Sequence, residues 1–260
     1  NNQDITEDEN DEAIGILDIP YVTFTSDDEM KFKISIQDRV YPISGLEYSV
    51  NNGDWIAIPE KGISDIQFGG SYGNLRLRGK NLNGTASGNS SYEAAYISFT
   101  SDNPDAKVAC TGDIRTLLDY ENYKTVDTSN ARFTRLFMNC TQLTSPPELP
   151  ATTLAKNCYY YMFRNCTSLT TAPELPATTL AESCYSYMFY GCTKLESVTM
   201  LATDVSASDC LYDWITDAGT GATSRALTVA SQTAYDAIVG NLPDIWKSGE
   251  GKATVIYKGQ

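Results

Sequence analysis

Histidine is absent from all 260 residues of the chain. Its absence excludes Ser-His-Asp and Cys-His nucleophile arrangements and every zinc site with a histidine ligand. Basic residues are scarce, because 19 Lys and Arg stand against 33 Asp and Glu, which gives a formal net charge of −14. A chain this acidic repels phosphate backbones and anionic membrane surfaces. We therefore expect no nucleic-acid partner.

Long apolar runs and cofactor motifs are also missing. No segment approaches the ~18 consecutive apolar residues of a membrane span, and there is no phosphate loop, EF-hand or HExxH pattern. We predict neither enzymatic activity nor a cofactor or metal. A pair of carboxylates that hydrolyses glycosides is the remaining catalytic alternative. Its candidates are Asp27-Asp28-Glu29 and Asp102 with Asp105, in segments that resemble turns, where acidic residues are common.

What the sequence does contain is a 26-residue repeat between Arg132 and Asp209. Within it, the segment 147–155 recurs unchanged as 173–181. Self-similarity at such a period is typical of solenoids, in which each unit buries its apolar face against its neighbours. Solenoids are mostly binding scaffolds, so the repeat predicts a class of function without naming the ligand.

Six of the seven cysteines follow this repeat. Cys158, Met162, Phe163 and Cys166 have the spacing of one face of a helix. Eight helical residues separate two cysteines by ~12 Å, and packed helices lie ~8–10 Å apart, whereas a disulfide needs Cα atoms within ~7 Å. We predict buried free thiols, with occasional pairing or a metal as the alternative. The two ladders are Cys140, Cys166 and Cys192, and Cys158, Cys184 and Cys210.

The regions outside the repeat differ from it in pattern. Residues 1–12 carry six carboxylates and no basic group, which predicts a flexible acidic tether over 1–18. Alternating apolar and polar residues, as in Tyr21–Thr25 and Lys31–Ile36, predict a β-sandwich over 19–108. The repeat region then covers 109–225. The last segment, 226–260, reads as a strand, a helix that begins after Ser231, and a final strand.

The unit Met-Phe-x-x-Cys-Thr-x-Leu-Thr-x-x-Pro-Glu-Leu-Pro, from Met162 to Pro176, resembles the BspA-like leucine-rich repeats of bacterial surface proteins. Arg132 replaces the first cysteine of the first unit, and Val198-Thr-Met200 replaces Ala-Pro-Glu in the third. The likeness covers about 105–240. The preceding β region resembles the sandwich domains that come before such repeats in Bacteroidales proteins. The resemblance implies an α+β protein: an N-terminal antiparallel β-sandwich, a short leucine-rich-repeat solenoid, and a C-terminal strand-helix-strand cap.

The resemblance also implies a location and a role. Members of the family with known roles are adhesins at the cell surface, which bind host matrix proteins or other bacteria. The chain begins without methionine, and its acidic start resembles a mature lipoprotein without its lipidated cysteine. We expect membrane contact only through a lipid anchor that this chain lacks. Two functions remain open: protein adhesion through the repeats, or glycan binding as an accessory of a polysaccharide-uptake system.

Tyrosine is in excess, with 17 residues. It supplies rigid, amphipathic contact area that suits recognition. The spacing places Tyr159 and Tyr185 beside the buried stripe, as structural residues. Tyr160, Tyr190 and Tyr212 are the predicted exposed contacts, although they too could serve only to cover the interior.

Three further residues are candidate contacts. Glu148 and Glu174 repeat in register and could form an acidic row for a basic partner, or could be ordinary solvated charges. Trp55, beside the turn at 51–53, could stack on a sugar, or could belong to the core of the β-sandwich. None of these residues is predicted to be catalytic.

Overall fold

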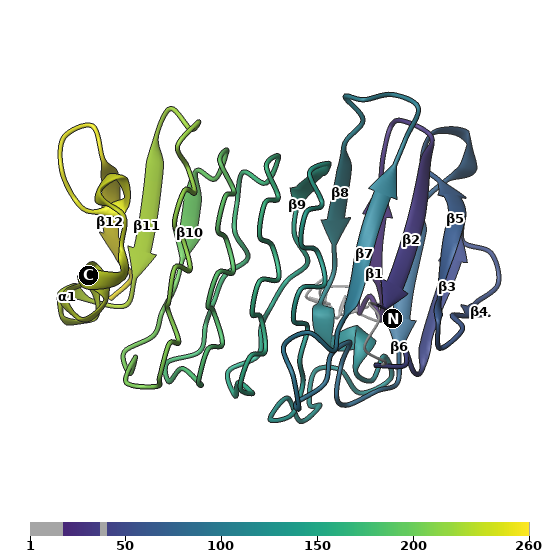
Figure 1. Cartoon of the computed structure of the whole chain (residues 1–260), viewed down its shortest axis with the longest axis horizontal. Helices are drawn as coiled ribbons and strands as arrows, with labels where there is room; N and C mark the ends of the chain where they lie inside the picture. The colour runs from purple at the N-terminus through teal and green to yellow at the C-terminus, as the bar shows by residue number, and fades with distance from the viewer. Residues whose placement is uncertain (1–17, 37–40, 260) are drawn as a thin grey trace, which may run out of the picture.

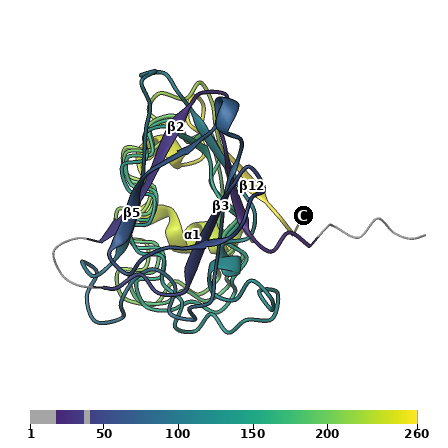
Figure 2. The same cartoon turned by 90° about the vertical axis from the view of Figure 1, so that its right-hand side faces the viewer.

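The computed structural model describes residues 18–36 and 41–259, and it is elongated (Figure 1). The N-terminal strands occupy one end, the repeats the middle, and α1 (Gln232–Ile238) and β12 (Ala253–Tyr257) the other end. Viewed along the long axis, β2 and β5 lie on one side and β3 and β12 on the other (Figure 2). No helix in these ranges is long and apolar enough to cross a membrane. All but the last residue of the predicted tether lies outside the described residues.

Two sheets enclose the N-terminal part of the core. Alternate residues of β2 are buried, as its sequence alternation predicts. Phe24 of β1 lies 5.4 Å from Phe99 of β7, ring centroid to ring centroid, and so joins the two sheets. In sheet order, the first sheet contains β4 (Ile56–Ala57), β3 (Leu46–Val50), β6 (Leu75–Gly79), β1 (Val22–Thr25), β8 (Val108–Thr111) and β9 (Leu143–Ser145), and the second contains β5 (Gly62–Phe68), β2 (Met30–Ile36) and β7 (Ala95–Thr100).

The repeat region consists of turns and not of helices. We define unit 1 as residues 132–157, unit 2 as 158–183 and unit 3 as 184–209. In unit 2 the backbone has a positive φ at Tyr161 and Asn165, 57° and 59°, which a right-handed helix cannot contain. The predicted helical stripe is therefore wrong. Its inward-facing residues were nevertheless identified correctly, because consecutive turns of four residues also bring every fourth side chain to the same side.

Backbone hydrogen bonds hold the turns of successive units together. The amide of Tyr159 donates to the carbonyl of Cys184 at 3.0 Å, and the amide of Phe163 donates to Met188 at 3.0 Å. The amide of Met162 instead donates back to Tyr159 at 3.1 Å. Alternate amides thus bond within a unit and to the next unit, which satisfies groups that would otherwise be buried without a partner.

The stacked units share one apolar core with the sheets at either end. It extends from Val22 to Ala253 without interruption. Phe137, Phe163 and Phe189 occupy the same place in successive units, with stacked rings 5.5 Å and 5.8 Å apart. All three are almost fully buried. The repeat period therefore appears in space as a column of phenylalanines.

A small parallel sheet ends the structure. α1 begins after Ser231, whose hydroxyl accepts a hydrogen bond from the amide of Ala234 at 3.1 Å, as the sequence predicts. The strands are β10 (Ser197–Thr199), β11 (Arg225–Val229) and β12 (Ala253–Tyr257), and the α-helix is α1 (Gln232–Ile238). The 3₁₀ turns are η1 (Gly70–Tyr72), η2 (Ile114–Leu117), η3 (Val239–Asn241) and η4 (Asp244–Trp246).

The predicted α+β class is wrong. Among the described residues α1 is the one α-helix, and the strands form three small sheets. The β region is not a separate antiparallel sandwich, because β9 of unit 1 joins its sheet in parallel with β8. The turns do not make the expected leucine-rich-repeat solenoid, and β11 and β12 share a sheet with β10 of unit 3 instead of forming a separate cap.

Candidate functional site

The repeats have two long faces, which continue the two N-terminal sheets. The turn wall comprises residues 133–140, 158–166, 184–192 and 210–218. It adjoins β7, where the amide of Ile97 donates to the carbonyl of Leu136 at 2.8 Å. The proline wall comprises residues 143–150, 169–176 and 195–201, and it begins at β9 beside β8.

Aromatic and arginine side chains gather on the outer side of the turn wall. The rings of Tyr161 and Tyr187, from units 2 and 3, stack with centroids 4.4 Å apart. Tyr160 lies 4.4 Å from Tyr161, and Tyr212 lies 5.4 Å from Tyr187 in an edge-on contact. We call the set the tyrosine–arginine strip, and it comprises Tyr92, Tyr160, Tyr161, Tyr187, Tyr190, Tyr212, Arg135 and Arg164.

The two arginines are inserted among these rings. The guanidinium of Arg135 lies 4.4 Å from the ring centroid of Tyr161 and 4.8 Å from that of Tyr92. Arg164 lies 5.2 Å from the centroids of both Tyr161 and Tyr190. Neither arginine forms an ion pair with any carboxylate in the described part of the chain. Arg135 is buried and its guanidinium donates to the carbonyl of Ser91 at 2.8 Å, whereas Arg164 is half-buried. The strip is therefore an aromatic surface with two arginines set among its rings.

The backbone carries these side chains in a conformation that bulky residues rarely adopt. Arg135, Tyr161, Tyr187 and Asp213 are equivalent positions of successive units, and all have positive φ, between 47° and 62°. Asn and Gly are the usual residues there. Such strain costs on the order of 1 kcal/mol or more per residue. The packing of the units must therefore enforce these conformations.

The strip leaves ring edges and hydroxyls available, while many ring faces are already covered. Tyr160 and Tyr190 are half-buried, and Tyr212 is 51% exposed. Burial raises the pKa of Tyr160 to about 12, with Tyr161 adding to the effect, which extends the protonated range of a hydroxyl that is already protonated at neutral pH. The protonated hydroxyl can both donate and accept hydrogen bonds. The strip thus offers polar edges around an aromatic and cationic centre.

Three members of the strip, Tyr160, Tyr190 and Tyr212, are among the residues predicted from the sequence. The sequence-based prediction does not include Arg135, Arg164, Tyr161 or Tyr187. The signal was present, because 135, 161 and 187 are spaced by the 26-residue period. Tyr92 had no such signal, since it precedes β7 and meets Arg135 only through folding.

Tyr159, Tyr185 and the ladder cysteines face inward. Tyr159 and Tyr185 are buried and stack with centroids 6.1 Å apart. All six ladder cysteines are buried free thiols. Two of them donate hydrogen bonds to phenylalanine carbonyls of the preceding unit, Cys166 to Phe137 at 3.1 Å and Cys192 to Phe163 at 3.0 Å. Burial raises the pKa of both thiols, to about 12 for Cys192.

Trp55 lies away from the strip, on the outer face of the six-stranded sheet. It is half-buried. The guanidinium groups of Arg76 and Arg78 lie 4.8 Å and 4.2 Å from its ring centroid, and the ring of Tyr21 lies 5.8 Å away. The tryptophan is therefore enclosed by side chains of its own sheet and is not part of the core.

The two predicted acidic turns meet in space. The side-chain amide of Asn103, in the second turn, donates to the Asp28 carboxylate of the first at 2.9 Å. The hydroxyl of Ser71 donates to the Glu29 carboxylate at 2.9 Å. The adjoining hollow has a volume of about 130 Å³. The carboxylates of Asp28 and Glu29 therefore each accept a hydrogen bond from a neutral side chain.

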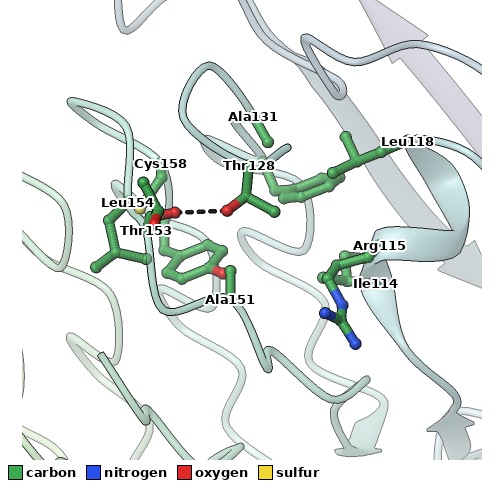
Figure 3. A pocket seen from close by; sticks show the side chains of 11 residues that line it. Ile114, Arg115, Leu118, Thr128, Ala131, Ala151, Thr153, Leu154 and Cys158 are labelled. Atoms are coloured by element: carbon green, nitrogen blue, oxygen red, sulfur yellow. Dashed lines mark hydrogen bonds between the residues drawn. The ribbon is translucent and has the colours of Figure 1, made fainter. Parts of the chain in front are cut away.

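A small cavity lies near the start of the repeats, between η2 and units 1 and 2 (Figure 3). Thr128 donates a hydrogen bond to the carbonyl of Thr153 at its edge, at 2.6 Å. Its volume is about 10 Å³, close to the minimum for one water molecule. The cavity is too small for a ligand.

Comparisons with known proteins give no family assignment. No family model, curated protein or solved structure matches the chain. In residues 18–36 and 41–259, no three side chains of His, Cys, Asp or Glu are grouped so that they could hold a metal ion. The tyrosine–arginine strip is thus the main candidate site, and its function must be argued from its own chemistry.

Proposed function

We propose that the chain is a non-enzymatic, cell-surface binding protein that recognises a protein partner through the tyrosine–arginine strip. The observation that carries the proposal is the strip itself, in which tyrosines of successive units surround two arginines that form no ion pair within residues 18–36 and 41–259. Tyrosine and arginine are enriched among the residues that dominate binding energy at protein interfaces. The cell-surface location rests only on the resemblance of the repeat motif to surface-protein repeats.

The covered ring faces favour a protein over a glycan. Stacking on a sugar needs a free aromatic face, but Tyr161 and Tyr187 stack on each other at 4.4 Å, and Trp55 has guanidinium groups within 5 Å of its centroid. The hydroxyls and edges that remain suit hydrogen bonds to main chain and polar side chains. The glycan alternative therefore has less support from the geometry.

A binding array with matched variants tests the proposal. The purified chain is presented to extracellular matrix proteins, bacterial surface proteins, and mucosal and dietary glycans, at low and high salt. Tyr212→Ala combined with Arg164→Gln should weaken protein binding at least tenfold. Tyr72→Ala, an exposed tyrosine outside the strip, should leave binding unchanged. Binding to glycans alone, or protein binding that the double variant leaves intact, would contradict the proposal.

A further inference from the structure

The proline wall contains a break that the turn wall lacks. Along the proline wall, the amide of Ala172 in unit 2 donates to the carbonyl of Ser197 in unit 3 at 3.0 Å. Between units 1 and 2, no backbone hydrogen bond or β-bridge joins residues 143–150 to 169–176, all of which are described. β9 is accordingly an edge strand of its sheet.

Proline removes one hydrogen-bond donor at this break. The residue of unit 1 equivalent to Ala172 is Pro146, which has no amide hydrogen to donate. The Pro-Glu-Leu-Pro motif also occurs in both units 1 and 2, so prolines of one unit lie beside prolines of the next. In unit 3, Val198-Thr-Met200 replaces the proline motif, and β10 forms there. The broken ladder is therefore confined to the junction of units 1 and 2.

A trough lies at this junction. Its volume is about 400 Å³, within the range of roughly 300–1,000 Å³ typical of ligand sites. We call it the proline trough, and its lining comprises Pro146, Pro147, Glu148, Leu149, Pro150, Pro173, Glu174 and Pro176. Three of the five prolines, Pro146, Pro150 and Pro176, are half-buried and supply apolar surface, and the two exposed glutamates supply charge of one sign.

The two carboxylates indicate the charge of the occupant. Glu174 pairs with Lys258 of this chain at 3.1 Å, so a lysine side chain does reach this rim. Glu148 is exposed, and no ion pair in the described ranges involves it. The net charge of −14 further attracts a cationic group. A lysine or arginine of a partner can therefore pair with Glu148 as Lys258 pairs with Glu174.

We propose that the proline trough binds an extended segment of a partner protein, with an aromatic side chain on the prolines and an adjacent Lys or Arg paired with Glu148. Flat aromatic rings pack well on proline surfaces, as in the recognition of proline-rich segments by aromatic grooves. This site is separate from the tyrosine–arginine strip and has the opposite charge preference. It does not depend on the function proposed for the strip.

A set of small peptides tests the proposal directly on the whole chain. Acetyl-tryptophanyl-lysine amide is titrated into ¹⁵N-labelled protein, and amide shifts are followed by NMR. The shifts should centre on residues 148, 149, 172 and 174, and binding should weaken as salt rises. Acetyl-tryptophanyl-glutamate amide and acetyl-glycyl-lysine amide should each bind at least fivefold more weakly, because each lacks one of the two required groups.

Matched variants separate the trough from general charge effects. Glu148→Gln should weaken the tryptophanyl-lysine probe at least fivefold. Glu196→Gln makes the same change at an exposed glutamate of unit 3, outside the trough lining, and should have no effect. The proposal is overturned if the probe does not bind at about 10 mM, shifts other residues, or binds both variants equally. Tyr212→Ala with Arg164→Gln should leave the probe unaffected, so the trough and the strip can fail independently.

Discussion

The turn wall and the proline wall both run through units 1 to 3, yet only the turn wall, which continues into residues 210–218, is bonded continuously. On the turn wall, the amides of Phe137, Phe163 and Phe189 each donate to the next layer, at 2.9, 3.0 and 2.8 Å. On the proline wall, Ala172 of unit 2 donates to unit 3, but the equivalent residue of unit 1, Pro146, has no amide hydrogen to donate to unit 2. A sequence period therefore guarantees equivalent places in space, but whether those places bond to one another depends on the residue at each place.

The two walls also differ in what they expose. The continuous turn wall can hold strained residues such as Tyr161 and Tyr187 in register, and so presents a dense aromatic surface with arginines between the rings. The interrupted proline wall leaves a hollow with carboxylates at its rim. Both proposed sites follow from this difference in backbone bonding.

The largest expected effect comes from breaking the phenylalanine column behind the turn wall. Phe163→Ala should destabilise the protein by about 3–5 kcal/mol, because it removes a fully buried ring and leaves a cavity. Urea denaturation followed by circular dichroism measures the loss. Tyr212→Ala, at an exposed ring of the same wall, is the control and should cost less than about 1 kcal/mol. Equal losses would show that the column is not part of a well-packed core.

Alkaline pH should weaken the turn wall next. Burial holds the pKa of Cys192 at about 12 in the folded protein, against a reference of 9.0. Below pH 9 the thiol is protonated in both states, and the free energy of unfolding does not depend on its ionisation. As the pH rises from 9 toward 12, only the unfolded thiol ionises, so the free energy of unfolding falls. The loss is about 1.4 kcal/mol per pH unit for each fully buried thiol.

Denaturation at a series of pH values under reducing conditions tests this dependence. Cys192→Ser should reduce the slope above pH 9 by the share of one thiol. A slope that the variant leaves unchanged would show that this thiol does not titrate with unfolding.

The break in the proline wall can be copied into the next junction. Ala172→Pro removes the amide that donates to Ser197 and leaves that carbonyl without its partner. The expected cost is about 1–3 kcal/mol, measured by urea denaturation. Ala172→Gly changes the same residue but keeps the amide, and it is the control. Ala172→Gly should cost clearly less than Ala172→Pro, and the opposite order would contradict the role of this hydrogen bond.

The reverse change should have the smallest effect on stability. Pro146→Ala restores an amide at the broken junction, where a new hydrogen bond contributes about 0.5–1.5 kcal/mol. The loss of proline costs a similar amount, about 0.4–1 kcal/mol, through the unfolded chain. The net change should stay within about 1 kcal/mol in the same denaturation assay. A change above 2 kcal/mol would mean that Pro146 has a packing role beyond its missing amide.

Sequence reasoning succeeded where one local rule determined the structure. Ser231 capped a helix, and alternation over 31–36 gave β2, because capping and strand alternation depend on neighbouring residues. It failed for the repeats, because residues at i, i+4 and i+8 share one side in a helix and also in a series of four-residue turns. The positive φ values at Tyr161 and Tyr187 decide between the two, and tyrosine gives no local sign of them.

The candidate sites were predicted only in part for a similar reason. Tyr160, Tyr190 and Tyr212 could be selected from composition and period. The contact of Arg135 with Tyr92 joins residues 43 positions apart and depends on β7 lying against unit 1. The proline trough could not be predicted, because it forms only where two copies of the Pro-Glu-Leu-Pro motif lie side by side without a backbone hydrogen bond between them.

By itself, the sequence determined the 26-residue period, the residues of each unit that face inward, the acidic charge, and the place of the prolines. These are properties of residue type and spacing along the chain. Only the tertiary structure decided that the units are turns and that the sheets at both ends continue into them. It also decided that the turn wall is hydrogen-bonded throughout while the proline wall is interrupted between units 1 and 2. These outcomes depend on which backbone amides and carbonyls of distant segments form hydrogen bonds, and those bonds form only when the units stack.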